Sequence, residues 1–95
     1  MIKRRAPKRF DLELSFPDLF NPSVIIGHRL PAVSHVSLKV YDAPGREVRP
    51  LVDEREDAGY YDVAFYADNL PSGVYSYRIE AGYFRVVSKF VLLRN

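Results

Sequence analysis

The chain contains no cysteine and no tryptophan, and it has no long apolar run. Without cysteine there can be no disulfide bond, thiol catalysis or cysteine-based zinc site, and the redox compartment stays undecided. No apolar run approaches the about 18 residues that a transmembrane helix needs, and none suits a secretory signal. Stability must therefore come from apolar burial, at roughly 25 cal/mol per Å².

The residues that are present favour one small globular domain. Hydrophobic residues make up 47% of the 95 residues, and they include seven Tyr and six Phe. This composition argues against disorder. A chain of this length can form one core, but it has little room for an enclosed active-site cavity as well.

Positive charge is concentrated at the N-terminus. The segment MIKRRAPKR (residues 1–9) has no acid and five basic residues, whereas residues 10–95 have nine basic and twelve acidic ones. We therefore divide the chain into a basic arm (1–9) and a domain (10–95). The arm either contacts an acidic protein or an anionic membrane surface, or is a solvated, disordered terminus. Nucleic acid is the weaker partner, because the domain is mildly acidic and shows no basic-aromatic stripe. The arm's basic residues are Lys3, Arg4, Arg5, Lys8 and Arg9.

Apolar residues alternate with polar ones along most of the domain, which is typical of strands with one buried face. The pattern predicts Val24, Ile26 and Leu30 as one inner set, with His28 at the same parity. The polar segment DEREDAG (53–59) is predicted to be a long connection. About seven strands without a helical period indicate an all-β fold, an immunoglobulin-like antiparallel β-sandwich. The expected strands are 11–16, 24–30, 35–41, 46–52, 61–67, 75–80 and 83–93.

Turn residues separate these segments. Asp42, Pro44 and Gly45 fit a tight turn, since Asp bonds its own backbone, Pro presets φ and Gly relieves the exit. The segment 69–73 and the pair Ala81 and Gly82 are read in the same way. After the turn at 69–73, Tyr75, Tyr77 and Ile79 face the core, and the tyrosine hydroxyls reach a rim or a backbone carbonyl.

Five stretches in order carry a resemblance to a known family: FDLELSFPDLFNPSVII, LKVYDAPGREV, AGYYDVAF, NLPSGVYSYRIEAG and KFVLLR. The chain resembles the type A C-terminal sorting domain of the bacterial type IX secretion system. The resemblance implies an immunoglobulin-like sandwich, similar to that of flagellar hook-capping proteins, and a non-enzymatic role as an export address. The matching structural positions are Phe20, Asn21, Pro22, Asp42, Gly45, Pro71, Ser72, Gly73 and Tyr75.

The chain also departs from that family. Asp18 and Leu19 stand where the family has Asn-Pro, and Phe65 stands where it usually has Trp. A sorting domain normally follows a large cargo, whereas this sequence begins about nine residues before the domain. It is either a fragment of a cargo protein or a free-standing subunit, and Met1 with its basic arm favours the subunit. As a subunit it is expected in the cytoplasm, where it is made, or peripheral to a membrane complex; as a cargo fragment it would reach the cell surface.

Catalytic and cofactor motifs are not found in the sequence. His28 and His35 have no cysteine or patterned carboxylates with which to bind a metal. Ser72 is read as a turn former, and the acids of 53–57 as a solvated loop because Arg55 interrupts any calcium-binding spacing. We expect no enzymatic activity and no cofactor.

The last segment, 83–93, is apolar at both parities. Phe84, Val86, Phe90 and Leu92 form one set. The other set is either covered by the domain's own loops or forms an interaction patch, for which exposed tyrosines such as Tyr60 and Tyr66 would be suitable. The candidate partner-binding residues, besides the basic arm, are Tyr83, Arg85, Val87, Lys89, Val91 and Leu93.

Two functions follow from this sequence. One is an accessory subunit that docks on a larger protein complex, and the other is the export address of a secreted protein. We expect the first.

Overall fold

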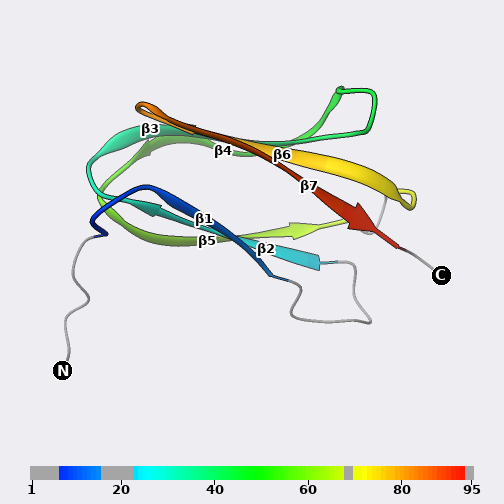
Figure 1. Cartoon of the computed structure of the whole chain (residues 1–95), viewed down its shortest axis with the longest axis horizontal. Helices are drawn as coiled ribbons and strands as arrows, with labels where there is room; N and C mark the ends of the chain where they lie inside the picture. The colour runs from blue at the N-terminus through cyan, green and yellow to red at the C-terminus, as the bar shows by residue number, and fades with distance from the viewer. Residues whose placement is uncertain (1–6, 16–22, 68–69, 94–95) are drawn as a thin grey trace.

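The computed structural model describes residues 7–15, 23–67 and 70–93. These residues form seven strands and no helix (Figure 1), so the predicted all-β class is confirmed. None of the described segments is a helix suited to crossing a membrane. The strands are β1 (Asp11–Ser15), β2 (Ser23–Leu30), β3 (Ser34–Tyr41), β4 (Glu47–Glu56), β5 (Gly59–Tyr66), β6 (Gly73–Ala81) and β7 (Phe84–Leu92).

The strands form two antiparallel sheets that pack face to face. One sheet has the order β1-β2-β5 and the other the order β4-β3-β6-β7, and Figure 1 shows them as two layers. β4 pairs with β3, whereas the fourth strand of a constant-type immunoglobulin domain lies beside the fifth. The edge strands are therefore β1 and β5 in the first sheet and β4 and β7 in the second.

The core lies between the sheets and is built from the alternating positions that the sequence indicates. β2 buries every second residue, including Ile26, His28 and Leu30. β3 and β6 alternate in the same way. The predicted inner residues of β6, Tyr75, Tyr77 and Ile79, are each 5% exposed or less. The inner sets predicted for β2 and β6 are thus confirmed.

The segment 53–59 is not a long connection, and this prediction was wrong. β4 continues to Glu56, and β5 begins at Gly59. The register with β3 shifts at two places, so that Val48 and Leu51 are extra residues on β4, as in β-bulges. Both pack against the core with Val52. Asp53, Glu54 and Arg55 continue the strand because an edge strand can direct charged side chains toward solvent, whereas Glu56 contacts the buried His28.

The turns follow the chemistry expected of their residues. Gly45 donates its N–H to the Asp42 carbonyl (2.9 Å) and has a φ of 96°, while the Arg46 N–H donates to Asp42 Oδ1 (2.8 Å). At the last hairpin the two turn residues are Gly82 and Tyr83, so β7 begins one residue later than predicted. Gly82 has a φ of 59° and no described non-glycine residue has a positive φ, which fits a type II′ turn.

Several predicted positions lie outside the described residues. These are Phe16, Asn69, and the motif and arm residues Phe20, Asn21, Pro22, Lys3, Arg4 and Arg5.

Candidate docking surface

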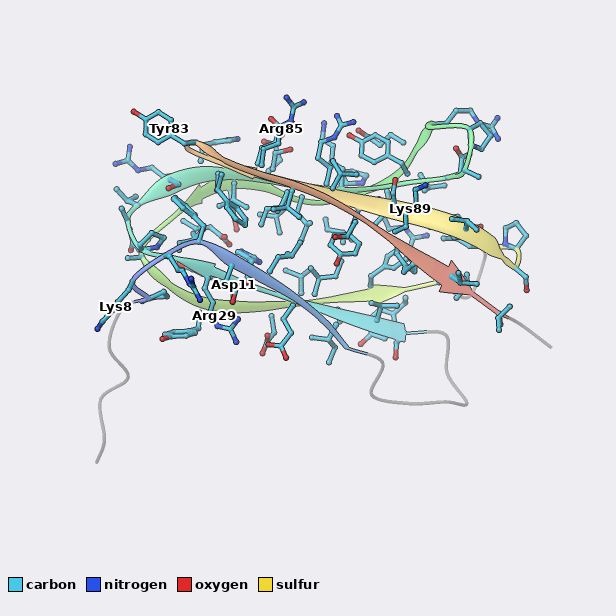
Figure 2. All side chains as sticks on the ribbon, in the orientation of Figure 1. Lys8, Asp11, Arg29, Tyr83, Arg85 and Lys89 are labelled. Atoms are coloured by element: carbon cyan, nitrogen blue, oxygen red, sulfur yellow. The ribbon has the colours of Figure 1, made fainter. Side chains whose placement is uncertain are left out.

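The outward side of β7 is exposed, so the domain's described loops do not cover it. Val87 is 55% exposed and Val91 56%. Arg85 and Lys89 lie on the same side of the strand and are exposed as well. Figure 2 shows Arg85 and Lys89 on the β6–β7 side of the sandwich. Coverage by the domain's own loops, one of the two alternatives left by the sequence, is therefore not found in the described residues, and the interaction patch stays a prediction.

β6 extends this exposed side. Val74 is 45% exposed and lies directly opposite Val91, while Arg78 lies opposite Val87. We call the outward side of β7, together with Val74 and Arg78, the β7 face. Val74 was not among the residues predicted from the sequence, although it shares the parity of Arg78 and the hairpin register places it beside Val91.

Charge on the β7 face is mainly positive. Arg85 is neutralised in part by Glu80, 3.3 Å away. Arg78 lies over the ring of Tyr41, 4.8 Å from its centroid, and its Nε is buried without a hydrogen-bond partner. Lys89 forms no ion pair within the described part of the chain. β7 itself contains no acid.

Lys39, a cation on β3 of the same sheet, forms an ion pair. Lys39 Nζ lies 3.3 Å from Glu47 Oε1. The hydrogen bond from the lysine to Glu47, with the negative charge of that carboxylate, raises the pKa of Lys39. Of Lys39 and Lys89, the lysine without an ion pair among the described residues is thus the one at the β7 edge.

Two of the other edge strands, β1 and β4, carry features that discourage pairing with a further strand, and one carbonyl at the end of β5 is already hydrogen-bonded. β1 has only five residues. β4 contains Pro50 and two register shifts, and both features are common protections of a sheet edge. On β5, the carbonyl of Tyr66 accepts a hydrogen bond from Arg49 Nη1 (2.7 Å).

β7 has none of these features, but it carries two charged side chains, Arg85 and Lys89, which oppose pairing with a strand of like charge. It is nine residues long, without Pro or Gly, and its register with β6 runs without a shift from Leu92 to Phe84. No other described strand pairs with it. Long, regular edges of this kind are templates for an added strand.

The turn geometry shows which backbone groups point to the free edge. Only two residues join β6 to β7, so Ala81 and Phe84 form the first hydrogen-bonded pair. Hydrogen-bonded and non-hydrogen-bonded pairs then alternate along an antiparallel ladder. The residues whose N–H and C=O groups point away from β6 are therefore Arg85, Val87, Lys89 and Val91, the same residues whose side chains line the β7 face.

The remaining candidate residues lie at the ends of this surface. Tyr83 is 103% exposed at the tip of the β6–β7 turn, and Leu93 is 83% exposed just after β7. Lys8 and Arg9 are exposed. Phe10 stacks on Phe84 with 5.3 Å between the ring centroids, so these basic residues lie near the Tyr83 end. Figure 2 shows Lys8 and Tyr83 at the same end of the sandwich.

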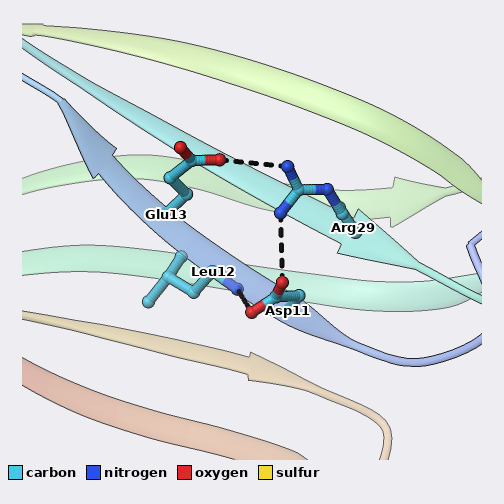
Figure 3. A network of polar contacts seen from close by, with 4 residues as sticks. All are labelled: Asp11, Leu12, Glu13 and Arg29. Atoms are coloured by element: carbon cyan, nitrogen blue, oxygen red, sulfur yellow. Dashed lines mark hydrogen bonds and ion pairs between the residues drawn. The ribbon is translucent and has the colours of Figure 1, made fainter.

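The two exposed tyrosines suggested by the sequence do not join this surface. Tyr60 and Tyr66 are on β5, in the other sheet. The outer side of that sheet is organised by Arg29, which lies 3.1 Å from Asp11 and 3.0 Å from Glu13 (Figure 3). The hydrogen bond to Glu13 is the largest contribution that raises the pKa of Arg29. Tyr60 lies beneath the same guanidinium.

Each histidine pairs with one carboxylate, a contact that the sequence did not reveal. His28 Nε2 is 2.7 Å from Glu56 and buried, whereas His35 Nε2 is 2.7 Å from Asp53 at the surface. A hollow of about 320 Å³ beside His35 is lined also by Val33, Ser34 and Arg55. The described residues include no group of three or more potential metal ligands.

No protein-family model matches the chain, and a search of curated proteins also gave no match.

Proposed function

We propose that this domain is a non-enzymatic docking module, an accessory subunit that binds a larger protein complex through the β7 face. The observation that carries the proposal is the exposure of Val74 and Val91, which lie side by side, and of Val87 on the same side of the sheet. Patches of exposed apolar residues bordered by charge are typical of protein interaction sites. The cations beside these valines favour a partner with an acidic surface.

The basic arm is the second contact. Lys8 and Arg9 are exposed near the Tyr83 end of β7, so the arm and the β7 face can meet one continuous partner surface. An acidic protein surface or an anionic membrane beside the complex would attract this charge, and salt would weaken the contact.

A matched pair of charge reversals tests the proposal. Lys89 and Arg55 are exposed cations at opposite edges of the same sheet, and Lys89→Glu and Arg55→Glu change the net charge equally. The tagged chain replaces the native one in its source cells, is crosslinked, and is purified with its partners. We expect Arg55→Glu to keep the wild-type partners and Lys89→Glu to lose them. Recovery of the wild type as a lone monomer would count against docking.

The alternative function is the export address of a type IX secretion cargo. The order of the motifs supports it, since the Asp42–Gly45 stretch and the Pro71–Tyr75 stretch both match the family's turn residues. The test is to fuse the chain behind a periplasmic reporter in a bacterium that has this system. Reporter at the cell surface would support the address, and reporter retained in the periplasm would exclude it.

A further inference from the structure

We propose that the free edge of β7 receives an extended partner segment, which adds to the four-stranded sheet as an antiparallel strand and presents alternating apolar and acidic side chains on its outer side. This inference rests on the proposed docking function and specifies the chemistry of the partner. Addition of a strand to an exposed sheet edge is a common mode of peptide recognition.

The backbone of β7 supplies the affinity. Arg85, Val87, Lys89 and Val91 direct their N–H and C=O groups away from β6. An added antiparallel strand pairs with these groups, and its residues directly opposite them place their side chains on the β7 face. The docking surface and the free edge therefore bind the same segment.

The side chains of β7 define that segment. Along the outward side, cation and valine alternate from Arg85 to Val91. Apolar side chains opposite Val87 and Val91 extend the exposed apolar surface, and acidic side chains opposite Arg85 and Lys89 form cross-strand ion pairs. Such cross-strand ion pairs are favourable, and like charges at the same positions are unfavourable.

A second copy of the chain is a poor occupant. β7 has two cations and no acid. When two β7 edges overlap fully, Arg85 lies opposite Val91 and Lys89 opposite Val87, so that neither cation gains an acidic partner and the two Lys89 side chains are diagonal neighbours. The charge pattern thus favours a different, acidic chain over a symmetric dimer. Sedimentation of the protein alone is expected to give a monomer, and a dimer that Val87→Pro abolishes would overturn the proposal.

The probe is a capped octapeptide in which every second residue is threonine. The residues between the threonines are valine and glutamate, one after the other. The control peptide has lysine in place of glutamate. Titration against the wild-type domain is expected to give binding at least about tenfold tighter for the glutamate peptide, and the difference is expected to shrink at high salt. Equal affinity of the two peptides would overturn the assignment of an acidic partner.

Backbone pairing is tested by N-methylation of the probe. Methyl groups on the valine and glutamate nitrogens block the donors that face β7, whereas methyl groups on the threonine nitrogens block donors on the far side. We expect methylation of the valine and glutamate nitrogens to weaken the affinity at least about tenfold. Methylation of the threonine nitrogens should change the affinity by no more than about threefold, because only alternate residues pair with β7. Equal loss would overturn strand addition. The wild-type domain is used throughout, so folding is not affected.

Backbone pairing is also tested with two variants of the domain at Val87. Val87→Pro removes an N–H that faces the free edge and leaves the ladder with β6 intact, while Val87→Thr keeps the N–H and changes the side chain. Strand addition predicts that Val87→Pro loses the probe and Val87→Thr keeps it. Equal binding by the two variants would overturn the inference.

The outcomes separate the two proposals. If Lys89→Glu loses the cellular partners while Val87→Pro keeps them, the β7 face docks through side chains and strand addition is wrong. If neither variant loses them, the docking function itself is wrong.

Discussion

His28 Nε2 lies 2.7 Å from Glu56 Oε1, and the two residues belong to opposite sheets. The His28 side chain is fully buried and that of Glu56 is 9% exposed. The imidazole also stacks on Tyr61, with 5.1 Å between the ring centroids, and its Nδ1 has no hydrogen-bond partner. Glu56 thus provides the polar contact of a buried ring and links the end of β4 to β2.

Removal of this carboxylate should destabilise the domain. Glu56→Ala leaves both nitrogens of His28 without a partner, and we expect it to lower the free energy of unfolding by about 1–3 kcal/mol. Glu56→Gln keeps an acceptor and should cost less. Urea denaturation at pH 7 measures both. If both substitutions lower the free energy of unfolding by the same small amount, the contact contributes little to stability.

The hydroxyl of Tyr75 should stabilise the turn before β6. It donates to the Pro71 carbonyl at 2.7 Å, similar to the tyrosine corner of immunoglobulin domains. Tyr77 is a matched control, since it is buried to the same extent on the same face, and its hydroxyl has no hydrogen bond within the described residues. Tyr75→Phe should lower the free energy of unfolding by about 1 kcal/mol and Tyr77→Phe by clearly less. The measurement is urea denaturation, and the reverse order would contradict the role of this bond.

Tyr61 should make the domain sensitive to alkaline pH. Burial raises the pKa of Tyr61 above its usual value, and the charges of Glu56, Asp57 and Glu54 raise it further. Folding therefore favours the neutral phenol, so this contribution to stability is complete below about pH 10, the unfolded value, and is lost as the pH rises through the folded value.

The test compares Tyr61→Phe with wild type. At pH 8 the variant should be the less stable one, because it lacks the hydrogen bond from the Tyr61 hydroxyl to the Asp57 carbonyl (2.6 Å). The difference in urea midpoint between wild type and Tyr61→Phe should become smaller as the pH is raised toward 11. Tyr83→Phe, at a fully exposed position, is the control for general alkaline effects. A constant gap would show that Tyr61 does not contribute to the pH dependence.

Alternation predicted the core because it depends only on which face of a strand is buried. Tyr75, Tyr77 and Ile79 were assigned correctly for this reason, and their neighbours on β3 complete the same layer. It failed for residues 53–55 because that segment belongs to an edge strand, where charge toward solvent is compatible with pairing, and for Glu56 because its partner His28 is distant in the sequence. Composition alone does not separate such a strand from a loop.

Only part of the candidate surface could be predicted from the sequence. The sequence identified the second apolar set of β7, but whether a loop covers it depends on the tertiary arrangement, which local patterns do not contain. The contact of His28 with Glu56 was hidden for the same reason, since 28 residues separate the pair along the chain. The hairpin register, in contrast, could have placed Val74 beside Val91.

The exposed valines of the β7 face should contribute little to folding. Val91 is 56% exposed, whereas Val36 is completely buried on β3. The substitution Val→Thr keeps the shape and adds a hydroxyl, which is costly only where water is excluded. We expect Val36→Thr to lower the free energy of unfolding by about 1–3 kcal/mol and Val91→Thr to change it by less than about 0.5 kcal/mol, measured by urea denaturation of the isolated domain. Equal losses would mean that Val91 is covered in solution, and the β7 face would then belong to the packing of the fold and not to a docking surface.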